Sequence, residues 1–285
     1  MPELPEVEIT ARRLDRRLAG TEVESALAPG MVALKSVSPP LSALAGRTIE
    51  SVGRVGKMPI VEFAGDGEPI AMLVHLMSAG RLQVFEKRAS LRDRRSRVLI
   101  RLAGGRELRL REFGTKQRAW AKLMPAAAIA DDEMVATLGP EAWPAPPLDH
   151  LAELVAEPRH LHPMLRDQRL IAGIGRSWVD EILWEARLSP FKKGVDLDPA
   201  EIERLHAALH VLGDAIEHYE DVVGDIVPDK MPMPLRVHRR QGEPCPRCGA
   251  TLAAVHFAEH LTTYCPDEQT AGRVLKDRRL SRLLK

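Results

Sequence analysis

The pattern of apolar residues in this chain changes at one proline-rich stretch, and that change limits the folds available to it. From about residue 21 to residue 125, apolar residues form short runs separated by Gly, Pro and Asp. Runs of this length and spacing predict seven or so strands of a β-sandwich. Residues 3–18 precede them with apolar side chains at helical spacing, which predicts an N-terminal helix. The runs span residues 32–34, 49–52, 60–63, 71–74, 82–85, 97–102 and 107–110.

The proline-rich stretch from Gly139 to Pro147 is typical of a linker. Beyond it the apolar spacing is helical, over residues 151–157, 163–170, 177–186 and 199–219, and a segment with three cysteines follows. This order predicts an α+β multidomain protein. Its expected parts are an N-terminal β-sandwich domain over 1–136, a linker over 137–150, a helical domain over 151–235, a small metal-type module over 236–270 and a basic C-terminal tail over 271–285.

Composition excludes several classes of protein. No stretch approaches the roughly 20 apolar residues of a membrane span, and no signal-peptide pattern opens the chain. We therefore expect a cytoplasmic protein with no membrane contact. Three cysteines in 285 residues argue against a disulfide framework and for a metal-binding or simple thiol role.

The charges are segregated although the net charge is only +1. Residues 86–122 carry 13 Lys and Arg against 4 Asp and Glu, whereas residues 195–229 carry 1 against 10. Such segregation fits a polyanion-binding face backed by an acidic one. The alternative, which the residues leave open, is that these runs are merely solvated helix faces.

The N-terminus carries a chemical possibility. If Met1 is removed, Pro2 becomes a free secondary amine, and an α-amino group titrates near ~7.7–8.0, low enough to act as a nucleophile at neutral pH. On a helix that starts near Pro5, Glu3 and Glu6 both approach that amine and could serve as acid and base. The alternative is an ordinary acid-rich helix start that the helix dipole favours.

The run Pro2-Glu-Leu-Pro-Glu-Val-Glu8 resembles the start of the formamidopyrimidine-DNA glycosylase/endonuclease VIII family, bifunctional enzymes that excise oxidised bases and then nick the DNA. The resemblance implies that Pro2 attacks the sugar C1′, Glu3 protonates the opening sugar ring and Glu6 orders the terminus. Lys57, in Arg54-Val-Gly-Lys57, matches a lysine that the family requires in such a hairpin.

Two further segments resemble the loops with which this family fills the gap left by a flipped-out base. His75-Leu-Met77 resembles the intercalating loop, although the family's methionine stands one place later, where this chain has Ser78. Arg111-Glu-Phe113 resembles the family's Arg-Arg-Phe turn. The resemblance gives Arg111 the place facing the orphaned base and Phe113 the wedge, with a glutamate where a second arginine is usual.

A Gly-x-Gly turn before a predicted helix resembles the family's helix–two-turn–helix. Gly173 and Gly175 would let the backbone approach closely, and the following helix N-terminus would bind a DNA phosphate. Arg176 stands where the family has asparagine. Arginine pairs strongly with phosphate but does not reproduce the compact geometry of asparagine.

The cysteine segment resembles the family's C-terminal zinc-finger hairpin, with Cys245, Cys248 and Cys265 in place and Glu268 at the position of the fourth cysteine. The resemblance implies one structural Zn²⁺ held by these four residues. Asp267, His256 or His260 could complete the sphere instead, and a metal-free hairpin is the open alternative. His260 also occupies the place of an arginine that grips phosphate in the family.

The resemblance thus implies an N-terminal β-sandwich with an N-terminal helix, and a C-terminal helix–two-turn–helix domain with a zinc-finger-like β-hairpin. The implied function is base-excision repair by a DNA glycosylase with AP (β,δ-elimination) lyase activity. The expected partner is double-stranded DNA with an oxidised base or abasic site, bound by a monomer at the nucleoid. The segment between Tyr219 and Arg236 looks short for a lid over an oxidised purine, so oxidised pyrimidines and abasic sites stay open. Two alternatives also stay open: a non-catalytic relative that binds damaged DNA, and a regulator whose cysteine hairpin binds RNA or protein.

Overall fold

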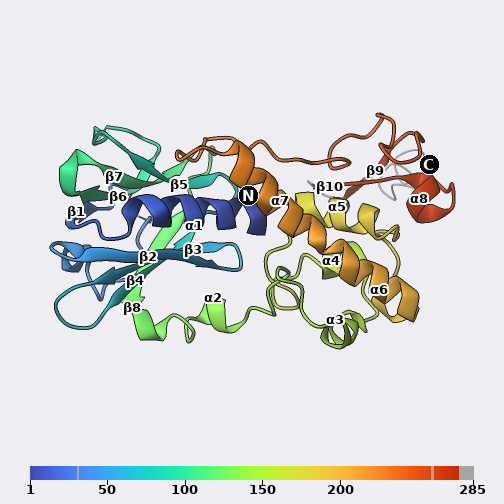
Figure 1. Cartoon of the computed structure of the whole chain (residues 1–285), viewed down its shortest axis with the longest axis horizontal. Helices are drawn as coiled ribbons and strands as arrows, with labels where there is room; N and C mark the ends of the chain where they lie inside the picture. Colours follow the sequence, from blue (N-terminus) through green and yellow to red (C-terminus); the bar gives the residue numbers. More distant parts are fainter. Residues whose placement is uncertain (31, 91, 258–259, 276–285) are drawn as a thin grey trace. The chain divides into compact units, whose positions relative to one another are not determined.

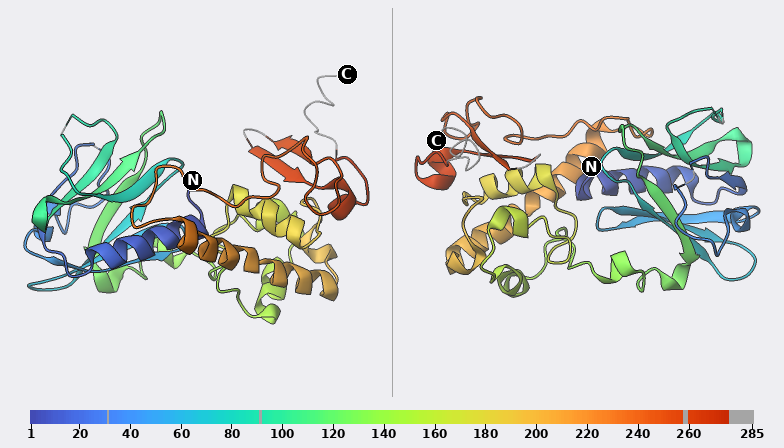
Figure 2. Two further views of the ribbon diagram at one scale, coloured as in Figure 1. Left: turned by 45° about the horizontal axis from the view of Figure 1, so that its top comes forward. Right: turned by 180° about the vertical axis from the view of Figure 1, so that it is seen from behind.

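The computed structural model describes residues 1–30, 32–90, 92–257 and 260–275 and divides the chain into two compact units. The first unit comprises Met1–Thr137 and Ile216–Pro232, and the second comprises Leu138–Ala215 and Met233–Lys285. Figures 1 and 2 show the strands of the first unit and the helices of the second. Most of the expected basic tail, residues 276–285, lies outside the described residues.

The first unit is a β-sandwich of two four-stranded antiparallel sheets, which confirms the expected fold class. One sheet has the order β1-β6-β7-β5 and the other β2-β3-β4-β8 (Figure 1). Burial alternates along part of β3, whereas β4, β6 and β7 are buried along almost their whole length. The strands are β1 (Val23–Leu27), β2 (Thr48–Val55), β3 (Met58–Ala64), β4 (Ile70–His75), β5 (Gly80–Phe85), β6 (Ser96–Leu102), β7 (Glu107–Glu112) and β8 (Trp120–Pro125).

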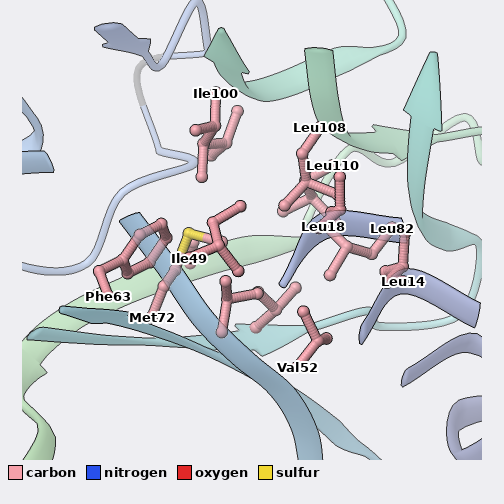
Figure 3. Packing of buried hydrophobic residues seen from close by; sticks show 14 of the residues in the cluster. Leu14, Leu18, Ile49, Val52, Phe63, Met72, Leu82, Ile100, Leu108 and Leu110 are labelled. Atoms are coloured by element: carbon pink, nitrogen blue, oxygen red, sulfur yellow. The ribbon is translucent and has the colours of Figure 1, made fainter. Parts of the chain in front are cut away.

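Helix α1 (Leu4–Leu18) begins where the sequence predicts it, because Glu3 and Glu6 form a reciprocal capping box and Pro5 lies in its first turn. It packs against β2 and β5, the edge strands of the two sheets. Its apolar stripe, which includes Leu14 and Leu18, enters one core with residues of both sheets, as Figure 3 shows. The helix therefore closes one edge of the sandwich and places the chain's N-terminus there.

Two strands of the sandwich differ from the expectation, and one expected strand is absent. Residues 32–34 form no strand, and Leu34 makes only an isolated bridge to Ala121. β1 and β8 were not predicted, because β1 carries mixed polar residues and β8 interrupts its apolar residues with Lys122. Both strands are specified by their partners: β1 pairs with β6 and β8 pairs with β4.

Residues 216–232 lie inside the range expected for the helical domain but group with the first unit. The guanidinium of Arg13, buried on α1, donates to the backbone oxygens of Glu220 and Val223 and pairs with the Glu220 carboxylate. Gln83 of β5 donates to the Val227 oxygen over 2.8 Å. These contacts join residues about 140 to 210 positions apart in the sequence. Local apolar periodicity does not encode such contacts, so the grouping was not predicted.

The second unit contains α3 (Leu148–Val155), α4 (Leu161–Met164), α5 (Arg176–Glu185), α6 (Pro199–Ala208) and the start of α7 (His210–Val222). The expected helix over 163–170 is wrong beyond Met164. The backbone there forms turns, in which the Asp167 carbonyl oxygen accepts the N–H groups of Leu170 and Ile171. The expected helix over 199–219 is divided at Leu209. The expected linker is packed: a Cβ at Gly213 would lie 2.3 Å from the Trp143 ring.

The remaining part of the second unit is a two-stranded hairpin, β9 (Ala253–Phe257) and β10 (His260–Tyr264), followed by α8 (Pro266–Thr270). Two buried carboxylates on α5 hold the segment that leads to it. Glu181 accepts the backbone N–H groups of Val237 and His238, and Asp180 accepts that of Thr263. A short α2 (Glu133–Ala136) precedes this unit. Among the described residues, no helix is long and apolar enough to span a membrane.

Candidate active site

The candidate catalytic residues at the N-terminus are held by hydrogen bonds from two directions. The Glu3 backbone N–H donates to Glu6 Oε2 over 2.8 Å, and the Tyr219 hydroxyl donates to Glu6 Oε1 over 2.7 Å. Glu3 and Glu6 are each 3% exposed and Tyr219 is fully buried. Pro2 is half-buried and follows the exposed Met1. The structure therefore fixes two carboxylates beside the residue that would become the terminal amine.

The electrostatics of this cluster keep Tyr219 a donor. Burial raises the pKa of Tyr219, and the neighbouring Glu6 carboxylate raises it further. Arg81 supplies positive charge nearby: burial lowers the pKa of its guanidinium, while Asp229 and Glu6 act in the opposite direction. Tyr219 and Arg81 were not predicted from the sequence as site residues. Neither carries a motif, because each reaches the site only through the packing of α7 and β5.

Lys57 lies in the two-residue turn between β2 and β3, where Gly56 adopts a φ of 54°. Its charge acts on His75, at the end of β4. Burial lowers the pKa of His75, and the Lys57 ammonium lowers it further against an opposing backbone hydrogen bond. The His75 ring stacks on Trp120 with centroids 5.4 Å apart, and its Nδ1 accepts the Met77 N–H. The Lys57 charge therefore acts on His75, whose Nδ1 is an acceptor.

The expected wedge residues lie on adjacent turns of the sandwich. Met77 is half-buried in the β4–β5 turn with a φ of 49°, and Ser78 beside it is exposed. Phe113 is 37% exposed, and its N–H donates to the Ala79 oxygen of that turn. The guanidinium of Arg111 lies over the Phe113 ring, 4.8 Å from its centroid. The structure thus brings together Met77, Arg111 and Phe113.

Glu112 does not take the outward position of the family's second arginine. It is 2% exposed, and its Oε2 accepts the Ala119 N–H over 2.8 Å while Arg97 lies 3.9 Å away. The carboxylate therefore anchors the loop between Phe113 and β8. Alternate residues of a strand point to opposite faces. A glutamate between Arg111 and Phe113 therefore points away from these two side chains, and this alternation could have predicted its inward position.

The glycine turn of the second unit has the close backbone approach that the sequence predicts. Gly173 has a φ of 103°, and its N–H donates to the Gln168 side chain over 3.0 Å. Gly175 is the N-cap of α5, and Arg176 begins that helix with an exposed side chain. Gln168, which also donates to the Ile174 oxygen, was missed because it precedes the motif.

The three cysteines converge on one point at the hairpin. Their sulfur atoms all lie within 4.8 Å of one another, and Cys248 Sγ is 3.4 Å from Cys265 Sγ. Burial would raise the pKa of Cys245, but N–H donors from Cys248, Arg247 and Trp184 lower it overall. Burial raises the pKa of Cys265 to about 12. Three converging sulfurs with N–H donors around one of them fit a thiolate metal site.

Glu268 is not brought into this group. Its Oε2 lies 3.1 Å from Arg187 Nε and 3.3 Å from Arg247 Nη1, so the carboxylate pairs with two arginines. Among the described residues, the group of metal-ligating atoms contains the three cysteines and neither Glu268, Asp267 nor His256. The side chain of His260 lies outside the described part of the structure. The expected four-residue ligand set is thus three residues in this geometry.

Comparisons with known proteins agree with this architecture. Residues 1–116 match the family model "Formamidopyrimidine-DNA glycosylase N-terminal domain", residues 138–225 match "Formamidopyrimidine-DNA glycosylase H2TH domain", and residues 242–267 match "Zinc finger found in FPG and IleRS". The formamidopyrimidine-DNA glycosylase of Pelotomaculum thermopropionicum is 32% identical over 284 residues, covering 93% of this chain and 98% of that protein.

Solved structures give the same result. The Lactococcus lactis Fpg in complex with DNA containing N7-benzyl-Fapy-dG superposes with a TM-score of 0.83 at 27% identity, covering 94% of this chain and 100% of that one. The same enzyme with DNA containing an abasic site gives a TM-score of 0.82 at 27% identity, covering 94% and 99%. The family models together cover most of the chain, and relatives and solved structures match it over nearly its whole length, so this chain belongs to the formamidopyrimidine-DNA glycosylase family of DNA-repair enzymes.

Proposed function

We propose that this glycosylase is bifunctional and that Pro2, freed by removal of Met1, is its nucleophile. The observation that carries the proposal is the hydrogen-bonded N-terminus. Buried Glu3 and Glu6 lie beside Pro2, and the Tyr219 hydroxyl donates to Glu6. Burial of two carboxylates costs stability unless both are fully hydrogen-bonded. The start of a helix does not require buried carboxylates, so helix capping alone does not account for this pair. Such a pair suits acid–base work on a bound sugar.

The chemistry follows from the amine. The Pro2 nitrogen forms a bond to the sugar C1′ as the bond from C1′ to the base breaks, and the departing base takes up the proton that the nitrogen releases. Glu3 then protonates the ring oxygen as its bond to C1′ breaks, which leaves an iminium. The iminium acidifies the C2′ proton, so its removal expels the 3′ phosphate, and a second elimination expels the 5′ phosphate. Hydrolysis of the iminium by water frees Pro2 and releases the sugar fragment, so a one-nucleotide gap remains. We propose that Lys57 holds a phosphate, and its place in a tight turn supports this role.

The DNA-binding residues support the same proposal. Arg111 and Phe113 are stacked on adjacent strand ends beside Met77, which suits a wedge that fills the place of an extruded nucleotide. The exposed Arg176 at the start of α5 suits a phosphate. The partner we propose is duplex DNA with an oxidised base or abasic site. Binding that rests on phosphates should weaken steeply with salt.

We also propose that Cys245, Cys248 and Cys265 hold one structural zinc ion. The convergence of three sulfurs and the zinc-finger family match support it. Zinc would tie α8 and the hairpin together, and would supply no chemistry to the reaction. Elemental analysis of purified protein should give one zinc per chain, and a stoichiometry near zero would contradict this part.

Borohydride trapping tests the nucleophile. Protein with Pro2 exposed, mixed with an abasic duplex and borohydride, should form a covalent complex at the mass of protein plus one DNA strand. The matched control retains Met1 through an N-terminal extension and should give none. Pro2→Gly should retain some trapping, since it keeps a terminal amine. If the processed protein forms no adduct, the lyase proposal fails and a non-catalytic relative that binds damaged DNA becomes the better description.

A panel of lesion duplexes tests the substrate. We propose that oxidised pyrimidines and abasic sites are substrates on the same footing as 8-oxoguanine, because few residues separate Tyr219 from Arg236. Equal binding to undamaged and lesion-bearing duplex would instead favour a regulator that uses the cysteine hairpin for RNA or protein. We propose further that the protein acts as a cytoplasmic monomer on the nucleoid, which light scattering and fluorescence microscopy would check.

A further inference from the structure

Residues 223–232, which we call the strap, are docked on the first unit at several points. Arg13 donates to the backbone oxygens of Val223 and Gly224, and Arg81 Nε donates to the Asp229 oxygen over 2.8 Å. Val223, Val227 and Met231 are buried at every fourth position. The strap is therefore a built part of this unit, with apolar anchors on one side.

The strap reaches Arg111 through one buried side chain and one carboxylate. Gln83, 4% exposed, donates from Nε2 to the Val227 oxygen over 2.8 Å and to Asp229 Oδ1 over 3.0 Å. Its Oε1 is then left to accept from Arg111 Nη1 over 3.2 Å. Arg111 Nη1 also donates to Asp229 Oδ1 over 3.0 Å. The strap thus sets the orientation of the Gln83 amide. The Gln83 amide in turn sets the orientation of the Arg111 guanidinium.

The described side-chain hydrogen bonds of Arg111 occupy one nitrogen of its guanidinium. Within the described part of the chain, its side-chain hydrogen bonds are all donated by Nη1, and its Nε is buried without a partner. The group lies over Phe85 and Phe113, 5.2 and 4.8 Å from their centroids, so its plane is held as well. A guanidinium fixed at one nitrogen and stacked on rings presents Nη2 in one direction, with little rotamer freedom left to lose.

We propose that Asp229, assisted by Gln83, is a positioning residue that orients Arg111 to read the base opposite the lesion. The proposal rests on the proposed function, which places Arg111 opposite the extruded nucleotide. A guanidinium discriminates between bases only when its N–H groups are aimed at their acceptors, whereas a mobile one acts as a diffuse positive charge. Asp229 therefore governs base selectivity at the orphan position, while phosphate contacts govern overall affinity.

The experiment measures dissociation constants for four duplexes with a stable abasic analogue, which differ only in the base opposite it. Wild-type protein should show a spread among the four. Asp229→Ala should narrow that spread by about tenfold, because one well-aimed arginine contact accounts for discrimination of that order. The matched control, Asp225→Ala, removes the same charge from an exposed carboxylate on the strap and should raise all four affinities alike without narrowing the spread.

Asp229→Asn keeps the size and one acceptor oxygen, so an intermediate spread is expected, and thermal unfolding of each variant reports whether the strap stays docked. An unchanged spread in Asp229→Ala, or equal narrowing in Asp225→Ala, would overturn the inference. The proposed function has a separate readout in the same experiment: a wild-type protein that binds abasic and intact duplex equally would fail there, whatever its spread.

Discussion

The N-terminal site and the cysteine hairpin differ in how far each follows the family pattern. At the N-terminus, Pro2, Glu3 and Glu6 are all present, both carboxylates are buried, and the Tyr219 hydroxyl donates to that of Glu6. At the hairpin, three sulfurs converge but Glu268 pairs with two arginines. The N-terminal residues thus follow the family pattern throughout, whereas the hairpin departs from it at the position of the fourth cysteine.

The difference teaches what each region needs from its residues. Two buried carboxylates have to be satisfied together, since removing one partner leaves the other unpaired. The hairpin is anchored without metal, because Asp180 and Glu181 of α5 accept backbone N–H groups from residues 237, 238 and 263. Trp184 adds a further anchor, with Arg236 and Arg247 stacked on its ring. These contacts hold β10 and the segment that leads to the hairpin independently of the cysteines.

The largest effect should come from breaking the N-terminal site. Glu3→Gln should reduce the single-turnover rate of base excision by about 10²–10⁴-fold, since a general acid contributes that much. The amide still accepts a hydrogen bond, so the helix cap and the fold should survive. Strand cleavage at a preformed abasic site should fall much less, because no base has to leave there. A Glu3→Gln protein that excises normally would show the carboxylate to be only a helix cap.

The next effect compares the cysteines with Glu268. Cys265→Ser should lower zinc affinity by more than about 100-fold, because it removes a thiolate ligand. Glu268→Gln should leave zinc affinity unchanged, because its carboxylate is occupied by Arg187 and Arg247. Competition with a chromophoric chelator measures both. If Glu268→Gln weakens zinc as much as Cys265→Ser does, the carboxylate leaves its arginines when metal binds, and the two regions are equally complete.

A smaller effect should follow from removing the brace between α7 and α1. Tyr219→Phe deletes the hydrogen bond to Glu6 and should cost about 1–3 kcal/mol of unfolding free energy, the range for a buried acceptor left short of a donor. Urea denaturation measures it. Tyr219→Phe should also reduce borohydride trapping, because Glu6 loses its donor. The chain's other tyrosine is the control: Tyr264 accepts the Leu275 N–H in the second unit, so Tyr264→Phe should leave trapping at the wild-type level. Equal losses of trapping in both variants would contradict a specific role for Tyr219.

The sequence predicts those parts of the fold that depend on local pattern. The N-terminal helix follows from its apolar spacing and from the Glu3 and Glu6 cap, and most strands follow from short apolar runs. The helix expected beyond Met164 failed because Asp167 and Gln168 bind nearby backbone groups and favour turns there. β1 and β8 were missed because their residues become strands only beside β6 and β4.

The candidate site divides in the same way. Motifs locate Pro2, Glu3, Lys57 and the cysteines, because their spacing is itself the signal. Tyr219, Arg81 and Asp229 belong to the same unit as the N-terminus but come from distant sequence, and only packing assigns them. The ion-pair partners of the Glu268 carboxylate could not be predicted from the sequence either, because they depend on where Arg187 and Arg247 lie in the fold.

The smallest expected effect tests whether the Lys57 turn belongs with the N-terminal site. Burial and the Lys57 charge lower the pKa of His75, so the folded protein binds this proton less readily than the unfolded chain does. The stability contributed by neutral His75 should be fully present above the unfolded pKa of about 6.5 and be lost as pH falls through the lower folded value.

Lys57→Met should raise the pKa of His75 toward its ordinary value, as measured by NMR titration of the ring, and should reduce that loss of stability on the acid side. Lys193→Met, which removes a lysine from the second unit, should leave the titration unchanged. If Lys57→Met also leaves it unchanged, the ammonium lies too far from His75 in solution to act with the residues around it.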